Sequence, residues 1–146
     1  MQVPSISIDV VTAARRSENP LAECGEQAVR SAELRYRKFL ALVGKYPGES
    51  LSPAKDIDEV WHLHMLHPRA YAEDCKRLFG DILDHDGGFG NDSDQQFEDL
   101  LAVFERTATL WNAEYAEPYV HDLHSEVVRC MKACRKACNK SGRVAA

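Results

Sequence analysis

The stretch SPAKDIDEVWHLHMLHPRAYAEDCKRLFG, residues 52–80, predicts two helices that meet at a kink. Ser52 and Pro53 are typical of an N-cap and a first helical position, so we expect the first helix to begin there. Its apolar residues recur at helical spacing, at Ile57, Val60, Trp61, Leu63 and Leu66. Pro68 disfavours helical geometry at His67, which makes His67 the expected N-cap of a second, shorter helix. Gly80 is typical of a residue that ends a helix, so the second helix is predicted to stop there.

The rest of the chain also shows helical periodicity. Further helices are expected over residues 20–43, 93–115 and 120–138. Ser93 and Gln96 form a capping box at the start of the second of these. Strand-like alternation does not persist beyond SISIDV at residues 5–10. We therefore predict an all-α fold, a small single-domain bundle of about four to five helices. Its expected parts are an extended N-terminal segment at 1–19, a helical domain at 20–138 and a flexible tail at 139–146.

The composition favours one soluble domain. The 146 residues are 45% hydrophobic, which suffices for one core, and no apolar run is long enough to cross a membrane. A net charge of -5 argues against general binding to nucleic acid or to an anionic membrane. The first residues lack the basic and apolar regions of a secretory signal, so we expect a cytoplasmic protein. In that reducing compartment, the five cysteines predict thiols or metal ligands rather than disulfides.

The densest chemical groups lie in residues 56–75, which combine three histidines with several carboxylates. Asp58 and His62 are spaced i, i+4, so they share a helix face and can supply two metal ligands or form a carboxylate–imidazole pair. On an ideal helix His64 points about 200° away from His62, so these two cannot hold one ion. A further ligand must then come from another element, and the candidates are His85, His121 and His124. Zinc or non-haem iron suits such ligands, and an open coordination position supports hydrolytic or oxidative chemistry.

Two interpretations without a metal stay open. In the first, Asp58 satisfies His62, Trp61 fills the core, and the cluster only braces the fold. In the second, His62 and Asp58 perform acid–base chemistry or bind a ligand. The sequence contains no Ser-His-Asp order, nucleophile elbow, phosphate loop or dinucleotide fingerprint. Acyl transfer and nucleotide-dependent reactions therefore have no support, and whether the protein is an enzyme stays open.

The C-terminal region combines cysteines with basic residues. Cys130, Cys134 and Cys138 recur every four residues along one helical stripe, which fits either core packing or a thiol site for a soft metal. The basic residues around them are typical of a solvated helix face. We do not expect nucleic acid as a partner, because this end has no aromatic residues for stacking. The alternative function is a non-catalytic interaction module that uses this basic, cysteine-bearing helix.

The sequence resembles the glycine-rich domain-containing protein-like family over most of its length. The resemblance is carried by Tyr46-Pro47-Gly48 and by Val60-Trp61-His62-x-His64-x-Leu66-x-Pro68-x-x-Tyr71-x-x-Asp74-Cys75. It implies a helical domain whose signature polar positions are Asp58, His62 and His64, in a family without an established reaction. One departure is Ala116, where the family pattern leads us to expect a glycine.

These observations together predict a metal-binding protein or a metal-dependent enzyme of unknown substrate. The candidate metal ligands are Asp58, His62, His64, His85 and His121. The candidate thiol site is Cys130, Cys134 and Cys138. The sequence does not say whether the partner is a small molecule or a protein, and we expect no association with a membrane.

Overall fold

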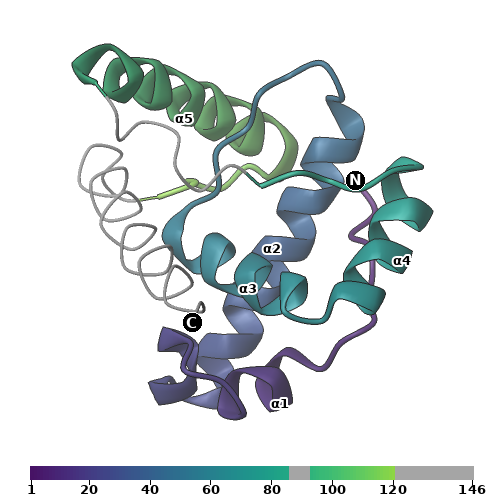
Figure 1. The fold of residues 1–146 in the computed structure, drawn as a ribbon. Coiled ribbons are helices and arrows are strands. Elements are labelled where there is room, and N and C mark those ends of the chain that lie inside the picture. The colour runs from purple at the N-terminus through teal and green to yellow at the C-terminus, as the bar shows by residue number, and fades with distance from the viewer. Residues whose placement is uncertain (86–92, 121–146) are drawn as a thin grey trace, which may run out of the picture. The chain divides into compact units, whose positions relative to one another are not determined.

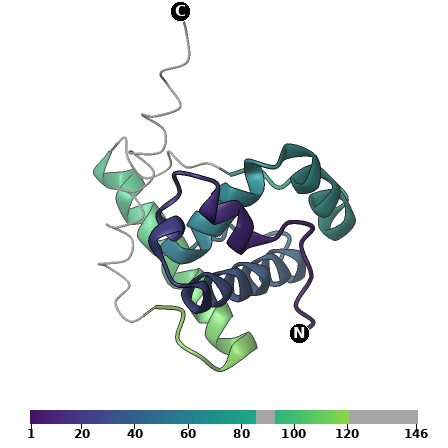
Figure 2. The same ribbon diagram turned by 90° about the horizontal axis from the view of Figure 1, so that it is seen from below.

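The structure is a computed structural model that describes residues 1–85 and 93–120 (Figures 1 and 2). Every regular element in these residues is helical, which confirms the predicted all-α class. None of the described helices is long and apolar enough to cross a membrane. Beyond its first residue, the helix expected over 120–138 falls outside the described part, together with His121, His124, Cys130, Cys134 and Cys138.

Contacts within the chain group it into two compact units. The first unit comprises Met1–Glu49 and Asp56–Asp84, and the second comprises Ser50–Lys55 and His85–Ala146. The sequence predicted one helical domain running from residue 20 to residue 138. The short segment before the third α-helix groups with the later part of the chain, which sequence periodicity does not reveal.

The first unit contains helix α1, Val10–Arg15, inside the segment that we expected to be extended. Asp9 is its N-cap, and one carboxylate oxygen accepts hydrogen bonds from the Val11 and Thr12 amides at 3.0 and 3.2 Å. Val10 is fully buried. A helix of six residues is too short to display a clear helical period, so its stability comes from burial and capping instead.

The segment expected as one helix over 20–43 forms two elements. These are the 3₁₀ helix η1, Pro20–Glu23, and helix α2, Glu26–Lys45. Gly25 separates them, because its extended backbone makes it the N-cap of α2 rather than a continuation of η1. The buried face of α2 contains residues that recur at helical spacing, namely Val29, Ala32, Tyr36, Phe39 and Leu40.

Helices α3, Lys55–Met65, and α4, Pro68–Phe79, confirm the predicted kink. His67 is the N-cap of α4, with a non-helical φ of -111° and ψ of 72°. Gly80 ends α4 with a left-handed φ of 83°, a conformation that favours glycine. Figure 1 shows the chain turning between α3 and α4 at this point.

The core of the first unit forms where α3 packs against α2. The Trp61 ring of α3 lies 6.4 Å from the Tyr36 ring and 5.7 Å from the Phe39 ring, centroid to centroid. Trp61 is buried, as the sequence predicted, and Ile57 and Leu63 are buried on the same helix. This packing fixes the rotation of α3, and therefore decides which of its polar side chains face inward.

The second unit contains helix α5, Asp94–Tyr115. Its predicted cap is present, because the Gln96 amide donates to the Ser93 hydroxyl at 3.2 Å. The helix ends at Ala116, which adopts a left-handed φ of 53°. This conformation explains why a glycine was expected at that position.

Ser52 is not the N-cap that the sequence predicted. Its amide donates to the Thr107 hydroxyl at 3.0 Å, and its carbonyl accepts from the Tyr119 hydroxyl at 2.9 Å. The Tyr119 ring in turn lies 5.3 Å from the Phe104 ring and 5.0 Å from the Trp111 ring. These hydrogen bonds hold Ser52 in a non-helical segment of the second unit, and α3 begins after it.

Candidate functional site

The most promising polar pair is Asp58 and His62, one turn apart on α3. Oδ1 of Asp58 lies 3.6 Å from Nε2 of His62. Asp58 is 2% exposed, whereas the side chain of His62 is 24% exposed. Asp58 also lies in the first turn of α3, where the helix dipole stabilises a negative charge. The structure thus places a buried carboxylate beside an imidazole that solvent can reach, on the shared face that their spacing predicted.

The separation of this pair suits a shared cation. Two ligand atoms at about 2.1 Å from a tetrahedral ion lie roughly 3.4 Å apart. The observed 3.6 Å is close to that value and is long for a direct hydrogen bond. The two side chains can therefore hold a cation between them, or the carboxylate can orient the imidazole electrostatically.

His85 directly follows Asp84, the last residue of the first unit, and is itself the first described residue of the later part of the second unit. The chain just before it is anchored, because the Leu83 carbonyl accepts a hydrogen bond from the Tyr71 hydroxyl. That hydroxyl also accepts a hydrogen bond from the indole of Trp61 at 2.9 Å. His85 therefore lies two residues after a position, Leu83, that is held by a hydrogen bond to α4.

His64 lies in a different environment from His62. It is 1% exposed, with Nδ1 2.9 Å from the Tyr36 hydroxyl and Nε2 3.1 Å from Oδ2 of Asp74. A carboxylate only accepts hydrogen bonds, so Nε2 of His64 donates to Asp74 and Nδ1 accepts from the Tyr36 hydroxyl. Burial lowers the pKa of His64, and the attraction of Asp74 only partly opposes this effect. His64 is therefore a neutral bridge within the core of the first unit.

Asp74 is the centre of this buried network. Its carboxylate accepts hydrogen bonds from the Ser7 amide, the Ser7 hydroxyl and the Arg77 guanidinium, each at 2.7 Å. Burial alone would raise the pKa of Asp74, but the hydrogen bonds from Arg77 and Ser7 outweigh burial and lower it. An ionised Asp74 thus joins the N-terminal segment, α3 and α4.

The structure separates the predicted ligands into distinct groups. Asp58 and His62 share one face of α3, whereas both ring nitrogens of His64 are engaged in the core. His121 and the candidate thiol site lie outside the described residues. Of the remaining cysteines, Cys24 is exposed and Cys75 is buried, and neither forms a disulfide.

Sequence reasoning missed the partners of His64. Asp74 and His64 both belong to the motif that carries the family resemblance, and this was the available signal. Tyr36 and Ser7 come from α2 and from the N-terminal segment, far away in sequence. Only the packing of α2, α3 and α4 brings these groups together.

The fold and the site define a small all-helical domain with a carboxylate–imidazole pair on one helix and a buried Tyr–His–Asp network beside it. Residues 4–74 match the sequence model of the glycine-rich domain-containing protein-like family, so this part of the chain is similar to that family. The matched segment contains both the Asp58–His62 pair and the network of His64, and it ends before His85.

Two plant proteins are similar to the chain. Glycine-rich domain-containing protein 1 of Arabidopsis thaliana is 31% identical over 122 residues, which cover 76% of this chain and 14% of the relative. Glycine-rich domain-containing protein 2 of the same plant is 31% identical over 96 residues, which cover 62% of this chain and 12% of the relative. The chain thus spans a small fraction of each relative. No solved structure matches the chain.

Proposed function

We propose that the domain binds a divalent transition metal through Asp58 and His62, with His85 as a third ligand. The observation that supports this proposal most directly is the Asp58–His62 pair, whose ligand atoms are 3.6 Å apart. Asp58, His62 and His85 each offer one ligand atom, and together they are a group that can hold a metal ion. The anchoring of Leu83 by Tyr71 favours His85, because it restricts where the next residues of the chain can go.

The donor set determines which metals fit. Two imidazoles and one carboxylate are the ligands of many catalytic zinc sites and of non-haem iron oxygenases. Three protein ligands leave at least one coordination position for water or substrate. The 24% exposure of the His62 side chain allows solvent to reach the ion. The proposed function is therefore metal binding with an open position, which supports hydrolytic or oxidative chemistry on a small molecule.

The experiment is a metal titration of the full chain after removal of metal with a chelator. Isothermal titration calorimetry with Zn²⁺, and with Fe²⁺ in the absence of oxygen, is expected to give one site per chain. His62→Ala removes a ligand and is expected to abolish binding, and His85→Ala is expected to weaken it at least tenfold. His67→Ala is the matched control, because His67 is an exposed histidine whose Nδ1 is bonded to the Leu63 carbonyl at 2.8 Å.

Two outcomes would contradict the proposal. The first is an absence of saturable binding in the unaltered chain, with a lower melting temperature for His62→Ala. That combination would mean that the pair only braces the fold. The second is binding that survives in His62→Ala but is lost in His67→Ala, which would place the metal elsewhere. Retained binding in His85→Ala at full affinity would remove His85 from the ligand set and leave the pair.

A further inference from the structure

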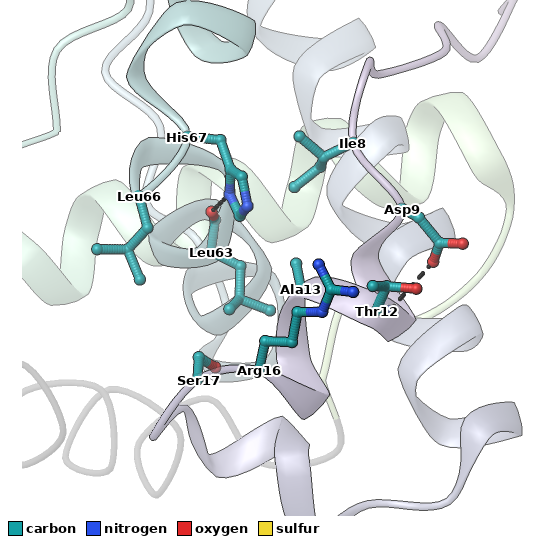
Figure 3. A pocket seen from close by; sticks show the side chains of 9 residues that line it. All are labelled: Ile8, Asp9, Thr12, Ala13, Arg16, Ser17, Leu63, Leu66 and His67. Carbon is teal, nitrogen blue, oxygen red and sulfur yellow. Dashed lines mark hydrogen bonds between the residues drawn. The ribbon is translucent and has the colours of Figure 1, made fainter.

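A pocket of about 330 Å³ lies within the first unit, and none of the residues of the proposed metal site lines it. One side comes from α1 and the residues that flank it, and the other comes from the end of α3 and the start of α4 (Figure 3). Its volume is at the lower end of the range for small-molecule sites. The pocket is therefore large enough for a small ligand.

One half of the pocket is apolar. Leu63 is fully buried and forms its floor, while Ile8 contributes a half-buried side chain. Leu66 is 67% exposed, the largest value among the large hydrophobic residues that the structure describes. An exposed leucine alone is ordinary. At the rim of a pocket with an apolar floor, it offers a surface that an apolar ligand chain can cover.

The other half of the pocket is cationic. The guanidinium of Arg16 has no hydrogen-bond or ion-pair partner among the described residues, and Figure 3 shows its side chain reaching into the space between the labelled groups. Asp9 also lines the pocket, but its carboxylate caps α1 and lies 3.6 Å from the guanidinium of Arg30. The guanidinium of Arg16 is thus available to a ligand, whereas the carboxylate of Asp9 already interacts with the start of α1 and with Arg30.

His67 adds a second polar group to this half. Its Nδ1 donates to the Leu63 carbonyl at 2.8 Å, which fixes the orientation of the ring. Its Nε2 has no hydrogen-bond partner among residues 1–85 and 93–120, and the ring is exposed at the pocket. Nε2 of the neutral ring is then an acceptor, so it can receive a hydrogen bond from a ligand donor beside Arg16 but does not itself bond a carboxylate.

We propose that this pocket binds a small monocarboxylate with an apolar chain. The guanidinium of Arg16 matches a carboxylate in charge and in its planar, two-donor geometry. The chain of the ligand then lies over Leu63 and against Ile8 and Leu66. A single cationic side chain favours one carboxylate over a more highly charged anion. This inference does not depend on the metal site and goes beyond the proposed function.

The test is a titration of the full chain with octanoate, followed by amide chemical shifts in NMR and by calorimetry. Octan-1-ol and acetate serve as ligand controls, because one lacks the charge and the other lacks the chain. Octanoate is expected to bind saturably and at least tenfold more tightly than either. The shifted amides are expected to cluster at residues 8–17 and 63–67.

Two matched pairs of variants separate the contributions. Arg16→Gln removes the pocket charge, whereas Arg15→Gln removes a neighbouring charge that lies 3.6 Å from Glu26 and does not line the pocket. We expect at least tenfold weaker binding for Arg16→Gln and less than a twofold change for Arg15→Gln. Leu66→Ser is expected to weaken binding several-fold, and Leu34→Ser, at another exposed leucine, is expected to leave it unchanged.

The proposal is overturned by any of four results. Octanoate binding that fails to saturate would mean that the pocket is not a binding site. Octanoate that binds no more tightly than octan-1-ol would remove the role of the charge. Equal effects of Arg16→Gln and Arg15→Gln would indicate general electrostatic attraction rather than a site. Equal effects of Leu66→Ser and Leu34→Ser would remove the apolar contact. Each readout is taken in a chelator, so the result is independent of the metal titration.

Discussion

Replacing His64 with alanine is expected to destabilise the protein far more than the same replacement of His62. The reason is the contrast in burial, because His64 is 1% exposed and bridges Tyr36 and Asp74, whereas the His62 side chain is 24% exposed. Loss of His64 leaves the buried Tyr36 hydroxyl without its acceptor, which costs about 1–3 kcal/mol. It also leaves a cavity, and truncations of core side chains of this size cost roughly 2–5 kcal/mol.

The expected loss for His64→Ala is therefore about 4 kcal/mol. His62→Ala is expected to cost about 1 kcal/mol, because the His62 ring is partly solvated. In this variant the charge of Asp58 is still stabilised by the helix dipole at the start of α3. The assay is urea unfolding followed by far-ultraviolet circular dichroism in the presence of a chelator, so that bound metal does not contribute. A shifted unfolding midpoint with an unchanged dependence of the unfolding free energy on urea concentration would mean that the variant changed the stability and not the surface exposed on unfolding.

A milder variant keeps the prediction testable if His64→Ala does not fold. Tyr36→Phe removes only the hydroxyl that bonds Nδ1 of His64 at 2.9 Å, so it is expected to cost about 1–2 kcal/mol. Equal losses for His62→Ala and His64→Ala, together with no loss for Tyr36→Phe, would refute the buried bridge.

Three further predictions follow from single residues. Ala116→Gly is expected to raise the free energy of unfolding by about 1 kcal/mol in urea melts, because the position has a φ of 53° and glycine adopts it without strain. Unfolding midpoints measured between pH 8 and pH 5 are expected to fall as the pH drops below about 6.5, because the pKa of His64 is lowered in the folded state and the unfolded chain takes up the proton first; a flat profile would contradict this. Thr107→Val leaves the Ser52 amide without its acceptor and is expected to cost about 1–3 kcal/mol, whereas Thr109→Val, at an exposed position, is expected to cost little; equal losses would contradict the anchoring of Ser52.

Local signals predicted much of the helical architecture. Pro68 and Gly80 impose backbone constraints that do not depend on distant partners, and both mark boundaries of α4 as expected. Ser93 caps α5 for the same local reason. Helix α1 was missed because its capping residue, Asp9, ends an alternating stretch that is typical of extended chain.

The candidate site was predictable only in part. The spacing of Asp58 and His62 fixes their shared face, because both lie on one regular helix. The role of Ser52 depended on a hydrogen bond to Thr107, a residue of a distant helix. The pocket beside Arg16 likewise requires α1 to lie near the end of α3, which no local pattern encodes.

A crystal structure with metal bound shows whether Asp58 and His62 are metal ligands. The most direct measurement is an anomalous difference map at the zinc absorption edge from crystals of the full chain grown with Zn²⁺. We expect one strong peak at about 2.1 Å from Nε2 of His62 and at a similar distance from the carboxylate of Asp58. A map without a peak at this pair, or with zinc bound elsewhere while Asp58 and His62 contact only each other, would show that the pair does not bind the metal.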